Sequence, residues 1–135
     1  MSENLDLVRS LFAAWERGDW SAVDWADPEI EYLLVDEPGA RRQSGVAAMV
    51  QTWRGYLSAW ENYRVEATEY RQLDAERVLV LLTAFGRGRA SGLDLGSVTR
   101  ERKGANVFHI RDHKVTRLDT YFDKRRALAD LGLPE

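Results

Sequence analysis

Residues 105–123 have the sequence ANVFHIRDHKVTRLDTYFD, in which two runs rich in β-branched and aromatic residues flank a polar turn at positions 111–114. This pattern predicts a β-hairpin. Successive side chains of a strand point to opposite faces, so each arm has one face with large apolar groups beside an amide or hydroxyls. Such a face suits the floor of a pocket, and it equally suits a structural hairpin. It carries Asn106, Phe108 and Ile110 on the first arm and Thr116, Leu118, Thr120 and Phe122 on the second.

The composition fits one globular domain. The chain has 135 residues, of which 44% are hydrophobic, and its five Trp, five Tyr and four Phe are enough for a core or a ligand cavity. The absence of Cys excludes disulfides, thiolate catalysis and zinc sites built on Cys. Residues 1–6 lack the apolar core of a signal peptide, and no run reaches the roughly 18 apolar residues of a membrane span. We therefore expect a cytoplasmic protein without a membrane partner.

Charge is unevenly spread along the chain. The net charge is −3, yet residues 1–40 hold ten acidic residues against two arginines. Basic residues gather later, around positions 87–103 and at 124–126. A nucleic-acid surface would need such residues beside interleaved aromatics. Solvated strand ends and a helix surface account for them better, so we expect no nucleic-acid partner.

Hydrophobic periodicity predicts three helices in the N-terminal half. Residues 4–17 and 45–60 each carry an apolar stripe at helical spacing. Between them, Asp19 is placed to cap a short helix over residues 19–25. A further short helix is expected after Asp123, near the C-terminal end.

The remaining segments predict strands. Alternation or β-branched runs place them at residues 29–35, 63–73, 77–89 and 99–110, before the return arm of the hairpin. Helices segregated to one side of a mostly antiparallel sheet make an α+β domain. We therefore predict one domain over residues 1–135, a cone in which the three helices pack on a curved, mostly antiparallel sheet and a short C-terminal helix follows.

The segment 78–85 is apolar on both of its faces. An antiparallel strand of this kind must be covered on both sides. The helices can cover one side, and we expect a second subunit to cover the other in a two-fold homodimer. If Thr83 and Phe85 line the cone, the outer interface holds Val80, Leu82, Ala84, Val107 and His109.

Four motifs occur at residues 15–20 (WERGDW), 27–32 (DPEIEY), 111–123 (RDHKVTRLDTYFD) and 127–133 (ALADLGL). Together with the order of elements they resemble the SnoaL-like branch of the NTF2-like superfamily, over essentially the whole chain. The resemblance implies the cone fold and the same homodimer. It does not imply one reaction, because the superfamily includes ketosteroid isomerases, polyketide cyclases, limonene epoxide hydrolases and members with no known activity.

The resemblance to ketosteroid isomerases, carried over residue by residue, leaves no carboxylate base. The positions of that enzyme's tyrosine, aspartate base and protonated aspartate fall on Leu11, close to Tyr32 and on Asn106, respectively. An amide at Asn106 can still donate a hydrogen bond to an oxyanion.

The resemblance to the two other enzyme families likewise leaves this chain without their catalytic acid–base residues in the pocket. The catalytic positions of limonene epoxide hydrolases fall on Thr83, Phe85 and Thr120, which offer no acid–base group. SnoaL-type polyketide cyclases use a pocket aspartate of the last strand, where this chain has Asp119. Alternation points Asp119 away from the pocket, and only a bulge would turn it inward. The sequence leaves open whether Asp119 or Asp94, which lies in a loop near the expected rim, reaches the pocket.

The resulting hypothesis is a hydrophobic cone pocket with few polar groups. Tyr32 and Asn106 are the candidate catalytic residues, although each equally suits a structural role. Two isolated His make a poor metal site, and we expect neither a metal nor a cofactor. One function that fits is binding of a hydrophobic small molecule, with cofactor-independent isomerase or cyclase chemistry; the alternative is a non-catalytic ligand-binding or dimerisation module. The expected pocket residues are Phe12, Trp15, Trp53, Thr83, Phe85, Phe108, Leu118, Thr120 and Phe122.

Overall fold

The computed structural model of the protein describes residues 3–36, 41–58, 60–88 and 100–134. Its six strands form one sheet in the order β2-β1-β6-β5-β4-β3. Neighbouring strands are antiparallel except β1 and β6, which run parallel. The elements are α1 (Glu3–Glu16), β1 (Ala26–Leu34), β2 (Arg41–Ser44), α2 (Val46–Ser58), β3 (Trp60–Gln72), β4 (Arg77–Gly88), β5 (Arg100–Arg111), β6 (Lys114–Tyr121) and α3 (Lys124–Leu131).

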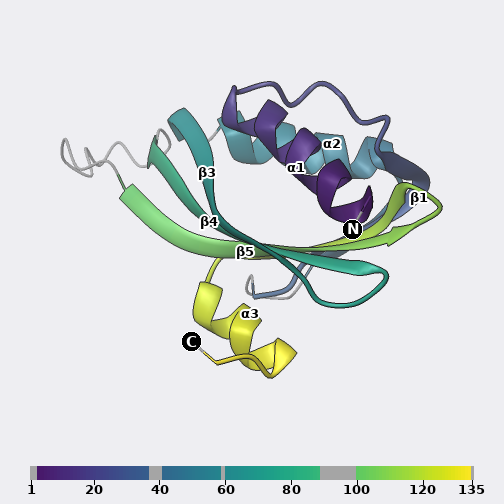
Figure 1. Ribbon diagram of the computed structural model, residues 1–135. Helices are drawn as coiled ribbons and strands as arrows, with labels where there is room; N and C mark the ends of the chain where they lie inside the picture. The colour runs from purple at the N-terminus through teal and green to yellow at the C-terminus, as the bar shows by residue number, and fades with distance from the viewer. Residues whose placement is uncertain (1–2, 37–40, 59, 89–99, 135) are drawn as a thin grey trace.

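The sheet is strongly curved, as the sequence predicted for an α+β cone. Figure 1 shows α1 and α2 on its concave side and α3 on its convex side. The pairing register shifts within β3 and near the β5–β6 turn, and such bulges bend a strand and increase its twist. The hairpin predicted from residues 105–123 forms, with Asp112 and His113 at positive φ in its turn.

The described residues of the N-terminal half form two helices, α1 and α2, rather than the three that were predicted. The expected short helix at residues 19–25 is absent. The Asp19 carboxylate instead accepts hydrogen bonds from the backbone N–H of Ser21 (3.1 Å) and from its hydroxyl (2.6 Å). Local bonds of this kind compete with the helical ladder. Throughout the described residues, no helix is long and apolar enough to cross a membrane.

The two faces predicted for β4 alternate as expected, but the inner and outer faces are exchanged. Val80 and Ala84 belong to the core on the concave side, and Leu82 packs against that core, whereas Leu81 belongs to a cluster on the convex side. A strand that is apolar on both faces carries no polar–apolar contrast to indicate its register. The pairing with β5 resolves the ambiguity, because Val80 lies opposite Asn106 and cross-strand partners share a face.

Helix α3, and not a second subunit, covers part of the convex face. Ala127 and Leu128 pack there against Leu79, Leu81 and other side chains of the sheet. The helix is capped by the Asp123 carboxylate and ends at Gly132, which has a φ of 69°. These local signals match the prediction for the final helix.

The predicted dimer interface must be revised for this reason. Val80, Leu82 and Ala84 lie on the concave side, and Val107 is buried in the cluster with α3. Val107 and His109 both lie on the convex face, as expected, but α3 covers Val107 and leaves only the His109 side chain, at 26% exposed, partly accessible among these five residues. The homodimer itself stays a prediction.

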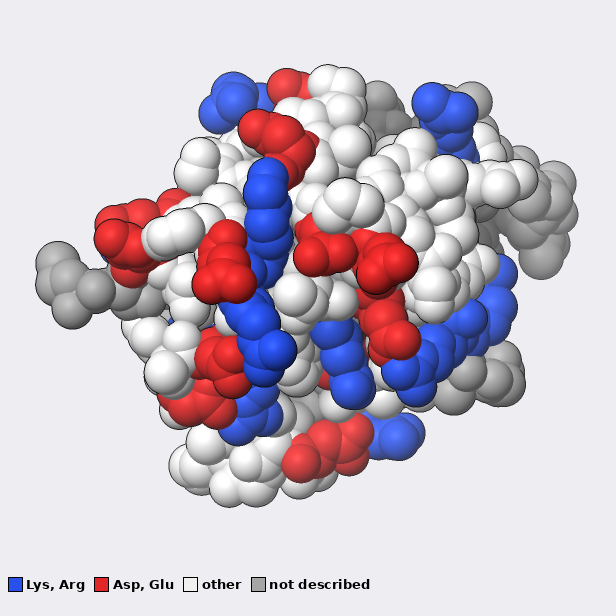
Figure 2. Space-filling model, turned by 90° about the vertical axis from the view of Figure 1, so that its right-hand side faces the viewer, with Lys and Arg blue, Asp and Glu red and all other residues white. Residues whose placement is uncertain are grey.

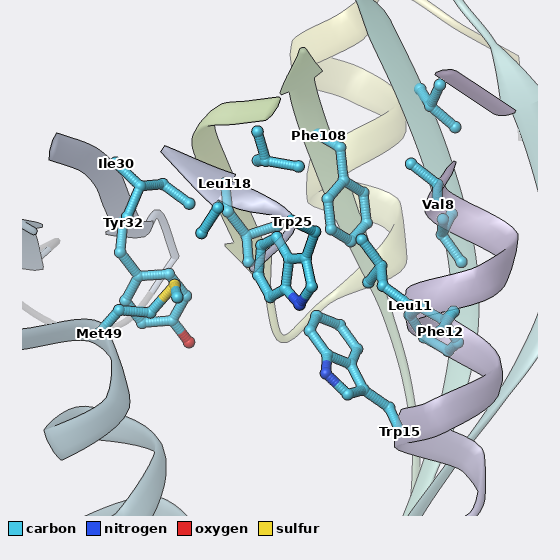
Figure 3. Close-up of a cluster of buried hydrophobic side chains, with 14 of the residues drawn as sticks. Val8, Leu11, Phe12, Trp15, Trp25, Ile30, Tyr32, Met49, Phe108 and Leu118 are labelled. Atoms are coloured by element: carbon cyan, nitrogen blue, oxygen red, sulfur yellow. The ribbon is translucent and has the colours of Figure 1, made fainter. Parts of the chain in front are cut away.

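An aromatic cluster joins the helices to the sheet (Figure 3). Its centre is Trp15 of α1, whose ring lies 5.5 Å from that of Trp53 on α2 and 6.0 Å from that of Phe108 on β5, between ring centroids. Trp20 stacks on the same ring at 5.1 Å, and Trp25 meets it edge-on at 5.8 Å. Both helices on the concave side are therefore held by one set of ring contacts.

The sheet leaves no room for a side chain at Gly104 of β5. A Cβ added there would lie 2.6 Å from the backbone carbonyl oxygen of Tyr121 on β6. We expect Gly104→Ala to lower the free energy of unfolding by about 1–3 kcal/mol, because the two strands must separate.

Gly55→Ala is the matched control: Gly55 lies in α2 with nothing within 4 Å of the added Cβ. We expect that variant to be more stable by about 0.5–1 kcal/mol. Urea unfolding followed by circular dichroism measures both, and a Gly104→Ala variant as stable as wild type would contradict the packing described.

Candidate functional site

A cavity of about 750 Å³ lies between the helices and the concave face of the sheet. Its volume is within the range of pockets that hold drug-sized ligands. Aromatic side chains form a large part of its wall, which favours a large apolar ligand. The aromatic side chains of the concave wall are Phe12, Trp15, Trp20, Tyr32, Trp53, Tyr63 and Phe122. The Tyr121 side chain instead packs on the convex side, where its hydroxyl donates a hydrogen bond to Asp130 of α3 at 3.0 Å.

The floor of the cavity carries a pair of polar side chains. The strand register places Asn106 of β5 directly opposite Thr120 of β6, and both line the cavity. On either side of this pair the same row continues with Leu34 of β1 and Val80 of β4. An amide and a hydroxyl therefore lie side by side in an otherwise apolar stretch of sheet, where a ligand oxygen can find a donor.

Tyr32 lines the same cavity from β1. Its side chain is buried, its ring meets that of Trp53 edge-on at 6.2 Å, and Figure 3 shows its hydroxyl directed toward the interior. Beside it on β2 lies Gln43, whose side-chain carbonyl accepts a hydrogen bond from the Thr52 hydroxyl of α2. The two candidate catalytic residues, Tyr32 and Asn106, are thus brought to one space.

The structure divides the pocket residues expected from the sequence into three groups. Thr83 and Phe85 lie on the convex face of β4, because the inner and outer faces of this strand are exchanged relative to the prediction. Leu82 and Ala84 line the cavity in their place. Phe108 is fully buried beneath Trp15. Those at the cavity are Phe12, Trp15, Trp53, Leu118, Thr120 and Phe122.

Sequence reasoning also missed several lining residues. Tyr63 lies in the β3 segment, whose side chains alternate between two faces. That alternation could have placed Tyr63 on the face that lines the cavity. Trp20 was assigned to a helix that does not form. Arg41 and Gln43 lie on β2, a short edge strand with the sequence RRQS, which carries no apolar pattern that would indicate a strand.

Among the described lining residues, Arg41 is the only one with a formal charge. The described part of the lining holds no Asp, Glu or His. Proton abstraction at neutral pH ordinarily uses one of these groups. The cavity offers instead phenol hydroxyls, amides and threonine hydroxyls, which can bind and orient a ligand. In the described parts of the chain there is also no group of three or more His, Cys, Asp or Glu that could hold a metal ion.

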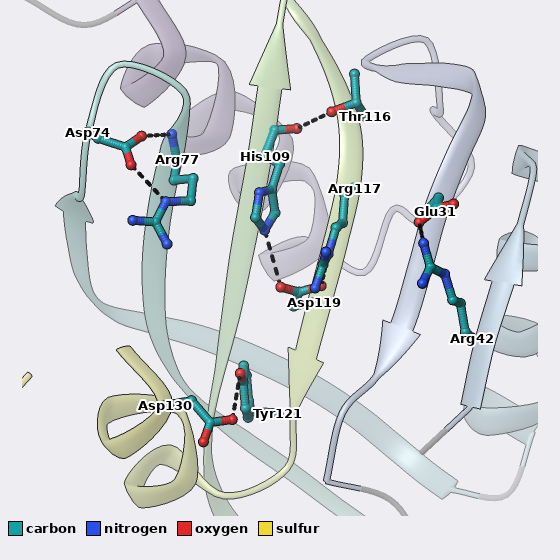
Figure 4. A network of polar contacts seen from close by, with 10 residues as sticks. All are labelled: Glu31, Arg42, Asp74, Arg77, His109, Thr116, Arg117, Asp119, Tyr121 and Asp130. Carbon is teal, nitrogen blue, oxygen red and sulfur yellow. Dashed lines mark hydrogen bonds and ion pairs between the residues drawn. The ribbon is translucent and has the colours of Figure 1, made fainter. Parts of the chain in front are cut away.

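Asp119 lies on the convex face, away from the cavity (Figure 4). One of its carboxylate oxygens is 3.1 Å from Nε2 of His109, and the other accepts a hydrogen bond from Nε of Arg117 at 2.7 Å. Burial alone would raise the pKa of Asp119, but these two partners outweigh burial and lower the pKa below its usual range. Asp119 therefore has a structural role here, whereas Asp94 lies outside the described residues.

A second, smaller hollow of about 340 Å³ adjoins His109. Its charged groups are already paired, Asp74 with Arg77 at 2.8 Å and Glu76 with Arg111 at 3.3 Å. Opposite charges also alternate over the side of the molecule shown in Figure 2. Neither feature presents the one-sided charge that attracts a polyanion.

A curved sheet that encloses helices and an apolar cavity defines a protein of the NTF2-like class, and solved structures share this fold. An NTF2-like protein from Burkholderia thailandensis is 20% identical with a TM-score of 0.77, over 99% of this chain and 100% of that one. A provisionally assigned polyketide cyclase from Xanthomonas campestris pv. campestris is 21% identical with a TM-score of 0.68, over 93% and 94% of the two chains. TerC, crystallised with polyporic acid, is 19% identical with a TM-score of 0.73, over 96% and 98%.

The family is identified by the sequence itself. Residues 8–118 match the SnoaL-like domain family, so the chain belongs to that family, as its motifs indicated. Among proteins with a curated function, none matches this sequence. At these identities the likeness to solved structures shows the fold alone.

The contacts of Asp119 predict a pH-dependent contribution to stability. We expect Asp119→Asn to lower the free energy of unfolding at pH 7 by roughly 1–3 kcal/mol, because hydrogen bonds to a charged acceptor are lost. The folded-state pKa is lowered, so the carboxylate contributes fully above its unfolded pKa of about 3.9. That contribution is lost as the pH falls through the folded-state value, and the difference between variant and wild type should shrink there. Urea unfolding between pH 3 and pH 7 measures it.

The matched control for this prediction is Asp112→Asn. Asp112 is exposed and lies in the hairpin turn with a φ of 51°, a conformation that Asn also tolerates. We expect no change in stability at any pH for the control. An Asp119→Asn variant that is equally stable at pH 7, or whose deficit does not depend on pH, would show that the network is not stabilising.

Proposed function

We propose that the protein binds a hydrophobic, ring-containing small molecule in the concave cavity. The observation that carries the proposal is the combination of an aromatic wall with the Asn106–Thr120 pair on the floor. Apolar surface that enters such a cavity contributes about 25 cal/mol per Å² removed from water. The amide and the hydroxyl then give the ligand an orientation, because an oxygen placed elsewhere would lose its hydrogen bonds.

The aromatic wall is largely formed before any ligand arrives. Trp20 packs at 6.0 Å against Trp53 and at 6.1 Å against Tyr63, in addition to its stacking on Trp15. Side chains fixed in this way lose little conformational entropy when a ligand binds. A preformed wall therefore favours a rigid, ring-containing ligand over a flexible one.

A second candidate function is cofactor-independent isomerase or cyclase chemistry. It is favoured by two hydrogen-bond donors, the Tyr32 hydroxyl and the Asn106 amide, at one cavity. Such donors can stabilise an oxyanion that develops on a bound carbonyl. The described lining lacks a carboxylate or imidazole to accept the proton, so binding is the function that this lining supports better. The cytoplasmic location and the homodimer stay predictions that do not alter this proposal.

A matched pair of ligands tests the proposal. We expect 9-fluorenone to quench tryptophan fluorescence saturably, and its hydrocarbon analogue fluorene to do so more weakly, because only the ketone can accept a hydrogen bond from Asn106 or Thr120. Asn106→Leu should weaken the binding of 9-fluorenone by about five- to tenfold, the equivalent of one lost hydrogen bond, and leave fluorene unchanged. Polyporic acid, with which TerC was crystallised, is a third probe.

Thr120→Val and Thr83→Val form the control pair for this experiment. Both remove a hydroxyl from a threonine of the sheet, but Thr83 lies on the opposite face, outside the cavity. Only Thr120→Val should weaken the binding of 9-fluorenone. Absence of saturable quenching by any of the three probes, or equal effects of the two threonine variants, would contradict the proposed binding site.

A further inference from the structure

The single charge in the described cavity lining has a defined place at its edge. Arg41 begins the edge strand β2, pairs with Leu34 of β1, and is exposed while it lines the cavity. The next residue, Arg42, points to the other face of the strand, where it pairs with Glu31 (Figure 4). Alternation along β2 therefore directs one guanidinium toward the cavity and its neighbour away from it.

The strand register puts this charge in line with the polar pair on the floor. Arg41, Leu34, Thr120 and Asn106 are successive partners on β2, β1, β6 and β5. Three strand spacings of about 4.8 Å separate the first from the last, roughly 14 Å along the sheet. The row thus offers a cation at one end, an amide at the other and an apolar Leu34 between.

We propose that the cavity selects an aromatic acid: a ring-containing ligand whose anionic oxygen group binds Arg41 while a second oxygen binds the Asn106–Thr120 pair. This inference rests on the proposed function and names its ligand class. A guanidinium stays charged at all relevant pH values and matches a carboxylate with two parallel hydrogen bonds.

The part of the cavity wall next to Arg41 is also polar, which suits an anionic group of the ligand. Gln43, Gln51 and Thr52 line the cavity from β2 and α2, on the side of the sheet where Arg41 lies. Amides and hydroxyls of this kind can hydrate or hydrogen-bond a carboxylate without neutralising it. The aromatic residues and the Arg41 side are thus distinct parts of one cavity, and a ligand with an apolar ring and one anionic group fits both.

The test compares 9-fluorenone-2-carboxylate with 9-fluorenone-2-carboxamide, which share their rings and ketone and differ in charge. We expect wild type to bind the acid at least fivefold more tightly than the amide, and this preference to weaken with added salt. Arg41→Gln should abolish the preference and leave the affinity for the amide unchanged. Arg41→Lys should keep part of it, because the charge remains but the bidentate geometry is lost.

Arg42→Gln is the control, since it removes the same charge from the same strand on the outer face. It should keep the preference for the acid. Equal binding of acid and amide by wild type, or an equal loss of preference in both glutamine variants, would overturn the inference while the proposed function stands. If neither ligand binds, the proposed function fails as well, so the two failures can be told apart.

Discussion

The packing of Trp15 against its ring neighbours is the interaction on which the rest of the structure depends. The side chain is 4% exposed and contacts aromatic rings from the loop after α1, from α2 and from β5. A buried Trp is worth about 3–5 kcal/mol relative to Ala. The same ring is part of the cavity wall, so the contact that fixes the helices on the sheet also shapes the space for a ligand.

Curvature of the sheet is the second requirement, because a flat sheet would leave no space beneath the helices. Register shifts bend the strands, and the Asp36 carboxylate, just beyond β1, accepts hydrogen bonds from the backbone N–H groups of Phe122 and Asp123 at 2.8 Å each. These two hydrogen bonds fix the end of β1 to the start of α3. Helix α3 covers part of the convex face, while helices α1 and α2 leave the concave side incompletely filled. The fold thereby separates a packed convex layer from a hollow concave one.

The sequence predicted the fold better than it predicted the site, and individual residues show why. The hairpin faces of Asn106 and Thr120 followed from alternation, because both arms mix polar and apolar residues. The segment Val78–Phe85 gave no such contrast, so Thr83 and Phe85 were placed on the wrong face. Arg41 was missed because a four-residue polar edge strand is stabilised only by its pairing with β1, which a local pattern does not reveal.

The central claim is that a small molecule occupies the space between the tryptophan wall and the Asn106 floor. Proton–nitrogen NMR spectra recorded during a titration with 9-fluorenone test it most directly, through the side-chain signals of Asn106 and the indole signals of Trp15, Trp20 and Trp53. The account predicts saturable shifts of these signals, with little change at Arg77 and His109 beside the smaller hollow. Shifts confined to Arg77 and His109, or no saturable shift at all, would contradict it.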